Sequence, residues 1–183
     1  MIRKRNPRRD DRIILDLVKR ELFPYTLRTM PNLRWDPSDV RRRLERNVTF
    51  VAVPGRGSAV GFASVRKVGK DVFLDMLAVD RNSQGKGLGA ELLRESERYA
   101  RSRGATTIRL YVDETNDRAR LFYARHGYAE EGYYPVLRCF GMGKMLNTSG
   151  ESPTGGYGRT GRAPIPRGER PPARSGRRGR RLL

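Results

Sequence analysis

The chain has 183 residues, for which we expect one domain of roughly 150 residues with a tail rather than two full domains. It holds 39 Lys and Arg residues against 20 Asp and Glu residues, a formal net charge of +19, and no apolar run of the ~18 residues that a membrane span needs. The first residues lack the apolar segment of a secretion signal, and one cysteine with one histidine excludes an internal disulfide and a Cys/His zinc site, so we expect a cytoplasmic, metal-free protein.

Strand and helix signals alternate along the first half of the chain. Asp10 or Asp11 is a candidate N-cap of an amphipathic helix, and Asp36 with Pro37 favours the start of a second helix. Apolar runs predict strands, of which the second and third form a hairpin: Ile2–Arg5 at an edge, Thr49–Val53, Ala59–Val65 and Val72–Val79.

The second half continues the alternation. We expect a helix from Gly87 to about Ser102, a strand at Thr107–Val112, a helix at Asn116–Arg125, and strands at Tyr128–Tyr133 and about Arg138–Leu146. This order predicts a mixed sheet with helices on both faces, an α/β fold.

Composition changes after Leu146. Residues 147–183 include 8 Gly and 5 Pro, and nine arginines oppose two glutamates. Such a segment buries too little apolar surface to offset its ordering entropy, so we expect a folded domain at residues 1–146 and a disordered basic tail at 147–183. Its Gly/Arg tracts are typical of RNA contact, but the presence of only one aromatic residue, Tyr157, favours a general electrostatic arm.

The charge of the whole chain has two explanations: attraction to RNA, a ribosome or an anionic cofactor, or simply an arginine-rich composition.

The densest motif is a strand that runs through a Gly-rich turn into a helix, at residues 77–90. Glycine allows a positive φ, and the first amides of a helix have no partner within it, so this pattern can receive a phosphate; a tight turn without a ligand is the alternative. The glycine spacing matches neither a Walker A loop nor the dinucleotide fingerprint.

These residues resemble a known family. Gln84-Gly85-Lys86-Gly87-Leu88-Gly89 fits the Gln/Arg-x-x-Gly-x-Gly/Ala signature of the GNAT superfamily of acyl-CoA-dependent N-acetyltransferases. A second motif of that family is similar to the set Asn116, Ala119, Phe122-Tyr123 and Gly127-Tyr128, and Met142–Leu146 resembles its closing strand. The resemblance covers residues 1–146. It implies a splayed sheet of about seven strands flanked by about four helices.

The resemblance also implies how acetyl-CoA is held, without a metal. The amides of Gln84, Gly85, Lys86, Gly87, Leu88 and Gly89 would bind the diphosphate, and the backbone of Leu77, Ala78 and Val79 would pair with the pantetheine arm. Asn116 would contact pantetheine, or act only as a helix N-cap, or both.

Two residues are candidates for the chemistry. The resemblance implies Tyr123 as the general acid for the thiol of CoA, with a packed helix aromatic as the alternative. Asp75 interrupts an apolar strand, and alternation places it on the same face of the strand as Phe73 and Leu77. It is the candidate general base, acting through a bridging water. The alternative is that Asp75 only forms an ion pair with an arginine. The chain departs from ribosomal-protein N-terminal acetyltransferases, which carry Glu where Tyr111 stands.

The acceptor is less specified. Tyr133-Tyr134-Pro135 resembles the Tyr-Tyr element with which N-terminal acetyltransferases cover the acceptor peptide, although the acidic continuation is missing and an ordinary Tyr-rich hairpin is the alternative. Three hypotheses follow: a protein N-terminal or ribosomal-protein acetyltransferase, a small-molecule amine acetyltransferase, and an RNA- or ribosome-binding protein on a GNAT scaffold. The sequence leaves a monomer and a homodimer open, and acetyl is expected as the commonest acyl group of the family.

Overall fold

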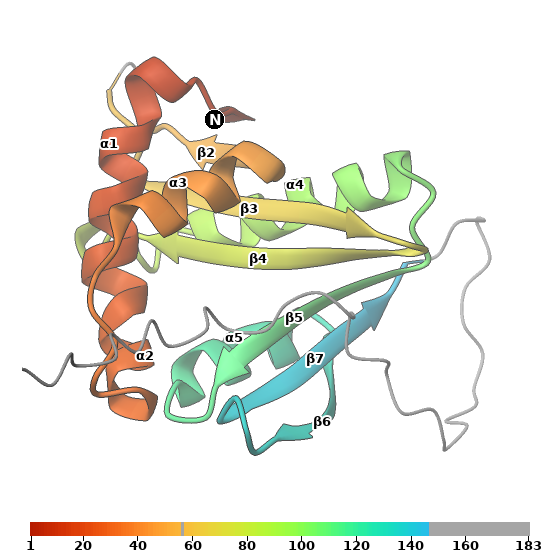
Figure 1. Ribbon diagram of the computed structural model, residues 1–183. Coiled ribbons are helices and arrows are strands. Elements are labelled where there is room, and N and C mark those ends of the chain that lie inside the picture. Colours follow the sequence, from red (N-terminus) through yellow and green to blue (C-terminus); the bar gives the residue numbers. More distant parts are fainter. Residues whose placement is uncertain (56, 147–183) are drawn as a thin grey trace, which may run out of the picture.

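A computed structural model describes residues 1–55 and 57–146 of the protein (Figure 1). One sheet holds seven strands in the order β1-β2-β3-β4-β5-β7-β6. All neighbours are antiparallel except the parallel pair β4 and β5. The strands are β1 (Ile2–Lys4), β2 (Val48–Ala52), β3 (Gly61–Val68), β4 (Asp71–Val79), β5 (Thr107–Asp113), β6 (Ala129–Tyr134) and β7 (Cys139–Met145). The predicted mixed sheet and its edge strand β1 are confirmed, and the predicted tail at 147–183 lies outside the described residues.

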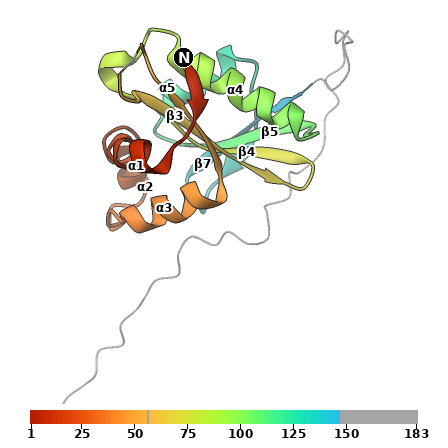
Figure 2. The same ribbon diagram turned by 90° about the horizontal axis from the view of Figure 1, so that it is seen from above.

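Helices cover both faces of this sheet, as predicted (Figure 2). On one face lie α1 (Pro7–Leu17), α2 (Phe23–Thr29) and α3 (Pro37–Arg46), and on the other α4 (Leu88–Ser102) and α5 (Asp117–Arg125). Each face has its own apolar core: Ile14 and Leu44 bury against Phe62 on the first, and Leu92 and Leu93 lie in the cluster of the second. Within the described ranges, no helix is both long and apolar enough to cross a membrane.

The start of α1 corrects the predicted cap. Asn6, not Asp10 or Asp11, is the N-cap, and its side-chain oxygen accepts the Arg8 amide at 3.1 Å. Pro7 follows in the first turn, where its missing N–H costs nothing. The Asn6-Pro7 pair therefore begins the helix one turn earlier than expected, and Asp10 lies buried in that turn.

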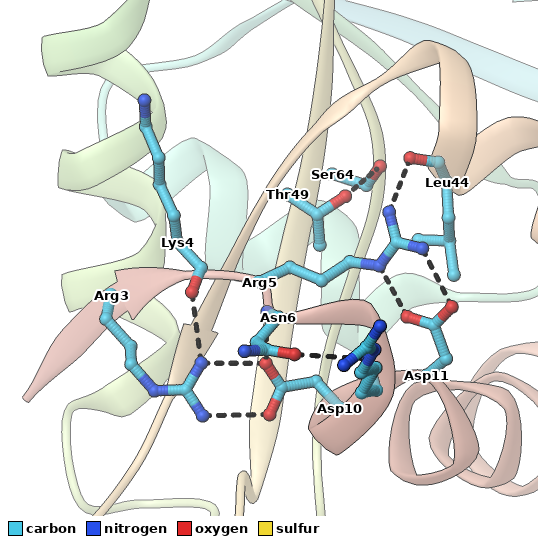
Figure 3. Close-up of polar contacts among 10 residues, drawn as sticks. Arg3, Lys4, Arg5, Asn6, Asp10, Asp11, Leu44, Thr49 and Ser64 are labelled. Atoms are coloured by element: carbon cyan, nitrogen blue, oxygen red, sulfur yellow. Dashed lines mark hydrogen bonds and ion pairs between the residues drawn. The ribbon is translucent and has the colours of Figure 1, made fainter.

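Two arginines of the first strand region fasten it to the helices (Figure 3). Arg3 Nη1 and Nη2 donate to the two oxygens of Asp10 at 2.7 and 2.8 Å. Arg5 Nε and Nη2 donate to the two oxygens of Asp11, and Arg5 Nη1 donates to the Leu44 carbonyl at 2.8 Å. These contacts join β1, α1 and α3 and spread the two charges over planar, bidentate pairs.

A second difference from expectation lies in the middle of β4. Ser64 of β3 pairs with Met76 and Val65 pairs with Leu74, so Asp75 is the extra residue of a β-bulge. The bulge breaks the alternation predicted for Phe73, Asp75 and Leu77. Leu77 packs against the core beneath α4, whereas Asp75 reaches Arg43 of α3 on the other face.

The sheet opens just beyond this point. β4 has nine residues, but only Asp71–Phe73 pairs with β5, opposite Thr107–Arg109. The two strands then diverge, as Figure 1 shows, and the predicted splay is confirmed. Backbone N–H and C=O groups along the diverging edges have no ladder partner there and can bind a ligand that carries amides.

The segment from Val18 to Thr29 is helical, which the sequence analysis did not anticipate. α1 runs into a wide π-helical stretch at Val18–Leu22, and α2 follows with Pro24 in its first turn. This long helical unit crosses the face of the sheet where β4 and β5 part (Figure 1).

Candidate active site

A cavity of about 430 Å³ lies at the opening between β4 and β5, within the usual range for ligand sites. Its walls come from the helical unit of α1 and α2, from the 33–36 segment and α3, from both diverging strands, and from α5. The residues that line it are Val18, Leu22, Phe23, Tyr25, Thr26, Leu33, Arg34, Trp35, Asp36, Asp39, Val40, Arg42, Arg43, Leu74, Asp75, Met76, Leu77, Tyr111, Val112, Asp113, Asn116, Ala119 and Tyr123.

The Gly-rich loop has the geometry of an anion-binding turn. Gly85 and Gly87 have φ of +76° and +78°, which side chains rarely tolerate. Gly87 is also the N-cap of α4, and in the described part of the chain no side chain caps that helix. The first intrahelical bond runs from the Glu91 amide to the Gly87 carbonyl at 3.0 Å. The Gln84 amide donates to the Arg81 carbonyl at 3.4 Å, whereas within the described residues the amides of residues 85–90 have no backbone partner and can bind an anion.

The other loop residues have structural contacts of their own. The Gln84 side chain donates to the Val79 carbonyl at 2.7 Å and closes the loop onto the end of β4. The Lys86 ammonium donates to the Asn82 carbonyl at 3.1 Å and is exposed. A side chain at Gly89 would meet the Phe122 ring at 3.4 Å, so this glycine lets α4 approach α5 closely.

Strand β4 supplies the three residues predicted for pantetheine. Leu77 lines the cavity, while Ala78 and Val79 are buried and pair with Phe62 and Gly61 of β3. Their other edge faces the diverging β5. One of these carbonyls, that of Val79, is already used by Gln84.

Tyr123 and Asn116 bring α5 into the same cavity. The Tyr123 side chain is buried against Phe122 and Tyr128, and burial raises the pKa of its hydroxyl. Burial disfavours the charged phenolate, so the hydroxyl stays protonated and can donate. Asn116 is the N-cap of α5, accepting the Ala119 amide at 3.1 Å, and its side-chain NH₂ remains able to donate.

Asp75 meets three donor atoms. Arg43 Nη2 donates to Oδ1 at 2.7 Å, and Arg43 Nε and Asn47 Nδ2 donate to Oδ2 at 3.0 and 2.9 Å. The ion-pair interpretation of this residue is thus present in the structure. Oδ2 already accepts two hydrogen bonds, but Oδ1 accepts one and can accept another, so Asp75 keeps acceptor capacity on that oxygen.

The aromatic pair Tyr133 and Tyr134 is not among the residues that line the cavity. The Tyr133 hydroxyl donates to Glu114, which also holds Arg138. Tyr134 packs edge-on against Tyr111 with ring centroids 5.3 Å apart. Tyr111 itself lines the cavity, and burial raises its pKa to about 12. The pair therefore reaches the site through Tyr111.

Sequence reasoning missed most of the wall opposite the sheet. Tyr25, Thr26 and Trp35 were not candidates, because α2 was not predicted and Trp35 has the pattern of a packing residue. Asp113 at the end of β5 was missed as well, although a carboxylate at a strand end next to a helix cap is a usable signal.

Two reactive side chains lie outside the cavity wall. His126 caps the C-terminal end of α5, with Nδ1 2.7 Å from the Phe122 carbonyl. Cys139 is buried, and burial raises its pKa to about 11, so its thiol stays protonated. No group of three or more His, Cys, Asp or Glu side chains suited to a metal ion occurs among residues 1–55 and 57–146.

Comparison with known proteins agrees with the geometry. Residues 13–128 match the model of the acetyltransferase (GNAT) family. The chain is 36% identical over 83 residues to streptothricin acetyltransferase of Streptomyces lavendulae, a match that spans 44% of each protein and so less than half of that relative. It is 30% identical over 111 residues to N-alpha-acetyltransferase RimI of Mycobacterium tuberculosis, covering 56% of this chain and 68% of the other.

The fold has close counterparts among solved structures. The ribosomal-protein-S18-alanine N-acetyltransferase of Escherichia coli superimposes with a TM-score of 0.65, at 23% identity, over 84% of this chain and 98% of the other. The family match spans both the Gly-rich loop and the α5 motif. The chain therefore belongs to the acetyltransferase (GNAT) family, a family of acyltransferases.

Proposed function

We propose that this protein transfers the acetyl group of acetyl-CoA to a primary amine bound in the cavity between β4 and β5. The observation that carries the proposal is that one cavity joins the open edge of β4 to Tyr123, with the anion-binding turn at the end of the same strand.

The chain's own groups fit acetyl-CoA. The amides of Gln84–Gly89 would hold the diphosphate, since Gly85 and Gly87 turn the backbone and α4 begins without a side-chain cap. The edge of Leu77, Ala78 and Val79 would pair with the pantetheine amides, and Asn116 would contribute its free NH₂. When bound, acetyl-CoA supplies the activated acetyl group.

The transfer requires a proton for the departing sulfur. The amine nitrogen forms a bond to the carbonyl carbon, the C–S bond breaks with its electron pair on sulfur, and the proton that nitrogen loses is balanced by one that sulfur gains. Tyr123 is the proposed donor to sulfur, because its buried hydroxyl stays neutral.

Asp75 is the proposed proton acceptor for the amine. Arg43 and Asn47 hold its carboxylate in one orientation at the cavity wall, and a bridging water would use the remaining acceptor capacity. A direct contact with the amine would have to displace one of these donors, so the water-mediated route fits the contacts better.

For the acceptor we propose first the α-amine of a protein N-terminus, a ribosomal protein among the candidates. The similarity to RimI supports this choice, and so does the aromatic wall of Tyr111, backed by Tyr134, which suits a peptide backbone. The positive charge of the chain suits a partner that contains RNA.

A small-molecule amine is the second candidate. It is favoured by the similarity to streptothricin acetyltransferase and by a cavity volume of about 430 Å³, which suits a small ligand. In the third alternative, an RNA- or ribosome-binding scaffold, acetyl-CoA would not bind.

The test measures thiol release from acetyl-CoA with N-terminal peptides that begin with Ala, Ser or Met, with lysine peptides, and with spermidine and an aminoglycoside. Turnover on peptide α-amines supports the first acceptor, and turnover only on free amines supports the second. Asp75→Asn should lower kcat and flatten the pH dependence if Asp75 takes the proton, whereas an unchanged pH profile would leave it a structural ion pair. Failure of the protein to bind acetyl-CoA would sink the proposal.

A further inference from the structure

Asp113 is the last residue of β5, and within residues 1–55 and 57–146 the hydrogen-bond partners of its side chain are all neutral. Its Oδ1 accepts the Thr115 amide at 3.0 Å and the Thr115 hydroxyl at 2.8 Å, and its Oδ2 accepts the Thr29 hydroxyl of α2 at 3.0 Å. The side chain is half-buried and lines the cavity. Three donors therefore fix a carboxylate at the cavity wall without neutralising its charge.

This lack of a cation is exceptional in the chain. Residues 1–146 contain ten aspartates. Within the described residues, nine of them have an arginine nitrogen within 4.0 Å: Asp10, Asp11, Asp16, Asp36, Asp39, Asp71, Asp75, Asp80 and Asp117. Asp113 is the exception, in a protein that holds 39 basic residues.

The basic side chains around the cavity do not neutralise Asp113. Arg43 is paired with Asp75, and Arg42 with Asp36 and Asp39. Arg34 lies on an exposed segment of the cavity wall, and across the described chain no ion pair joins it to Asp113. A half-buried carboxylate whose charge is unmatched attracts a cation from outside the protein.

We propose that Asp113 binds a positively charged group of the acceptor, an ammonium or a guanidinium, and so selects cationic acceptors. The inference rests on the proposed function and names the chemistry of its substrate. The cation can be the reacting ammonium before it loses its proton, or a second charge on the same molecule. The side chain faces α2, as the contact with Thr29 shows, so the acceptor enters along that helix.

Asp113→Asn is a suitable variant because its amide can keep the local contacts. The Thr29 hydroxyl already lies 3.1 Å from the Thr26 carbonyl, so it can donate there and accept from the new NH₂ group. Asp16→Asn is the matched control: it removes one negative charge from an exposed site on α1 that is not among the cavity residues.

The experiment compares propylamine with putrescine, and Ala-Gln-Ala with Ala-Lys-Ala, on the full chain. For Asp113→Asn we expect KM to rise about 10- to 100-fold for cationic acceptors, the scale of a lost charge-assisted hydrogen bond, with the KM of acetyl-CoA unchanged. A rise for all four acceptors assigns Asp113 to the reacting amine, and a rise only for putrescine and Ala-Lys-Ala assigns it to a second charge. KM values equal to those of the wild type and of Asp16→Asn for all four would overturn the inference.

Calorimetric binding of putrescine to the CoA complex separates this inference from the proposed function. Salt-sensitive binding to the wild type that Asp113→Asn loses supports the cation site even if no acceptor turns over. Equal binding to both proteins, or none to the wild type, refutes it.

Discussion

At the scale of single residues, environment rather than residue type decides which acidic and aromatic side chains serve the site. Asp75 and Asp113 both line the cavity, but only Asp75 has an arginine partner. Tyr123 and Tyr133 both belong to predicted functional motifs, yet Tyr123 is buried at the cavity while the Tyr133 hydroxyl is taken by Glu114. These differences are the basis on which we propose separate side chains for proton donation, proton acceptance and cation binding.

Replacing Tyr123 with Phe tests its role as proton donor. The change removes one hydroxyl in a buried position and keeps the ring contacts with Phe122 and Tyr128. We expect kcat to fall about 100-fold, the lower end for acid catalysis, with little change in KM for acetyl-CoA, measured by thiol release.

The matched control is Tyr99→Phe on α4, whose ring packs on Phe50 and is not among the cavity residues. Burial raises the pKa of the Tyr123 hydroxyl, so this group stays protonated in alkaline solution. We therefore expect no decrease in kcat from deprotonation of Tyr123 up to about pH 10. A fall in kcat near the ordinary tyrosine pKa that disappears in Tyr123→Phe would contradict the assignment.

At the scale of elements, strand β4 organises the site. Its pairing with β5 stops after three residues, its bulge places Asp75 and Leu77 on opposite faces, and its end leads into the Gly-rich loop. The opening of the sheet, the candidate base and the anion-binding turn are therefore placed by one strand and its continuation.

Gly87→Ala tests the loop. A side chain at a φ of +78° costs about 1 kcal/mol of unfolding free energy, and it also disturbs the turn whose amides would hold the diphosphate. We expect KM for acetyl-CoA to rise about 10-fold, the effect of losing one hydrogen bond to a charged group, measured by steady-state kinetics.

Gly69→Ala is its control, because Gly69 also has a positive φ, of +59°, and like Gly87 has open space around its Cβ position. It lies in the turn between β3 and β4, away from the loop. The control should lose similar stability and keep the KM of the wild type, so equal KM values in the two variants would remove the loop from acetyl-CoA binding.

At the scale of the whole molecule, ion pairs rather than a single core hold the edge of the sheet to its helices. Arg3 and Asp10 link β1 to α1, and the Asp10 side chain is only 2% exposed. The hydrogen bonds from Arg3, followed by the amide of Asn6, lower the pKa of this carboxyl despite its burial.

Asp10→Asn should lower the unfolding free energy by about 2 kcal/mol at neutral pH, since it leaves the Arg3 guanidinium without its charged partner. A carboxyl whose pKa is lowered by folding stabilises the protein above its unfolded pKa of about 3.9, and loses that contribution as the pH falls through the folded value.

Urea unfolding at several pH values measures this difference between wild type and variant. It should be constant above about pH 5 and shrink below about pH 4. A difference that stays constant in acid would mean that Asp10 acts through packing alone.

The basic tail is tested by ending the chain at Leu146. Residues 147–183 carry nine arginines, so their removal should weaken RNA binding and reduce its salt dependence, while turnover on a free peptide stays the same. Filter binding to a single-stranded RNA over a range of salt concentrations measures the slope. Equal slopes with and without the tail would argue against an electrostatic arm.

The sequence alone determined the order of the strands and of the helices other than α2, the Gly-rich loop, the α5 motif and the family, because periodicity, caps and glycine spacing are local signals. It placed Tyr123 and Asp75 among the candidates, and both line the cavity. The start of α1 was missed although Asn6-Pro7 has the same cap-and-proline pattern as Asp36-Pro37, and α2, which has Pro24 in its first turn, was not predicted.

Only the tertiary structure decided which side chains meet. Arg43 reaches Asp75 across 32 residues of sequence, and Thr29 reaches Asp113 across 84. The bulge that separates the faces of Asp75 and Leu77 depends on the pairing of β3 with β4. Within the described residues, no arginine forms an ion pair with Asp113, and this depends on where the fold places each of those arginines. Such contacts form between distant segments, and no local pattern encodes them.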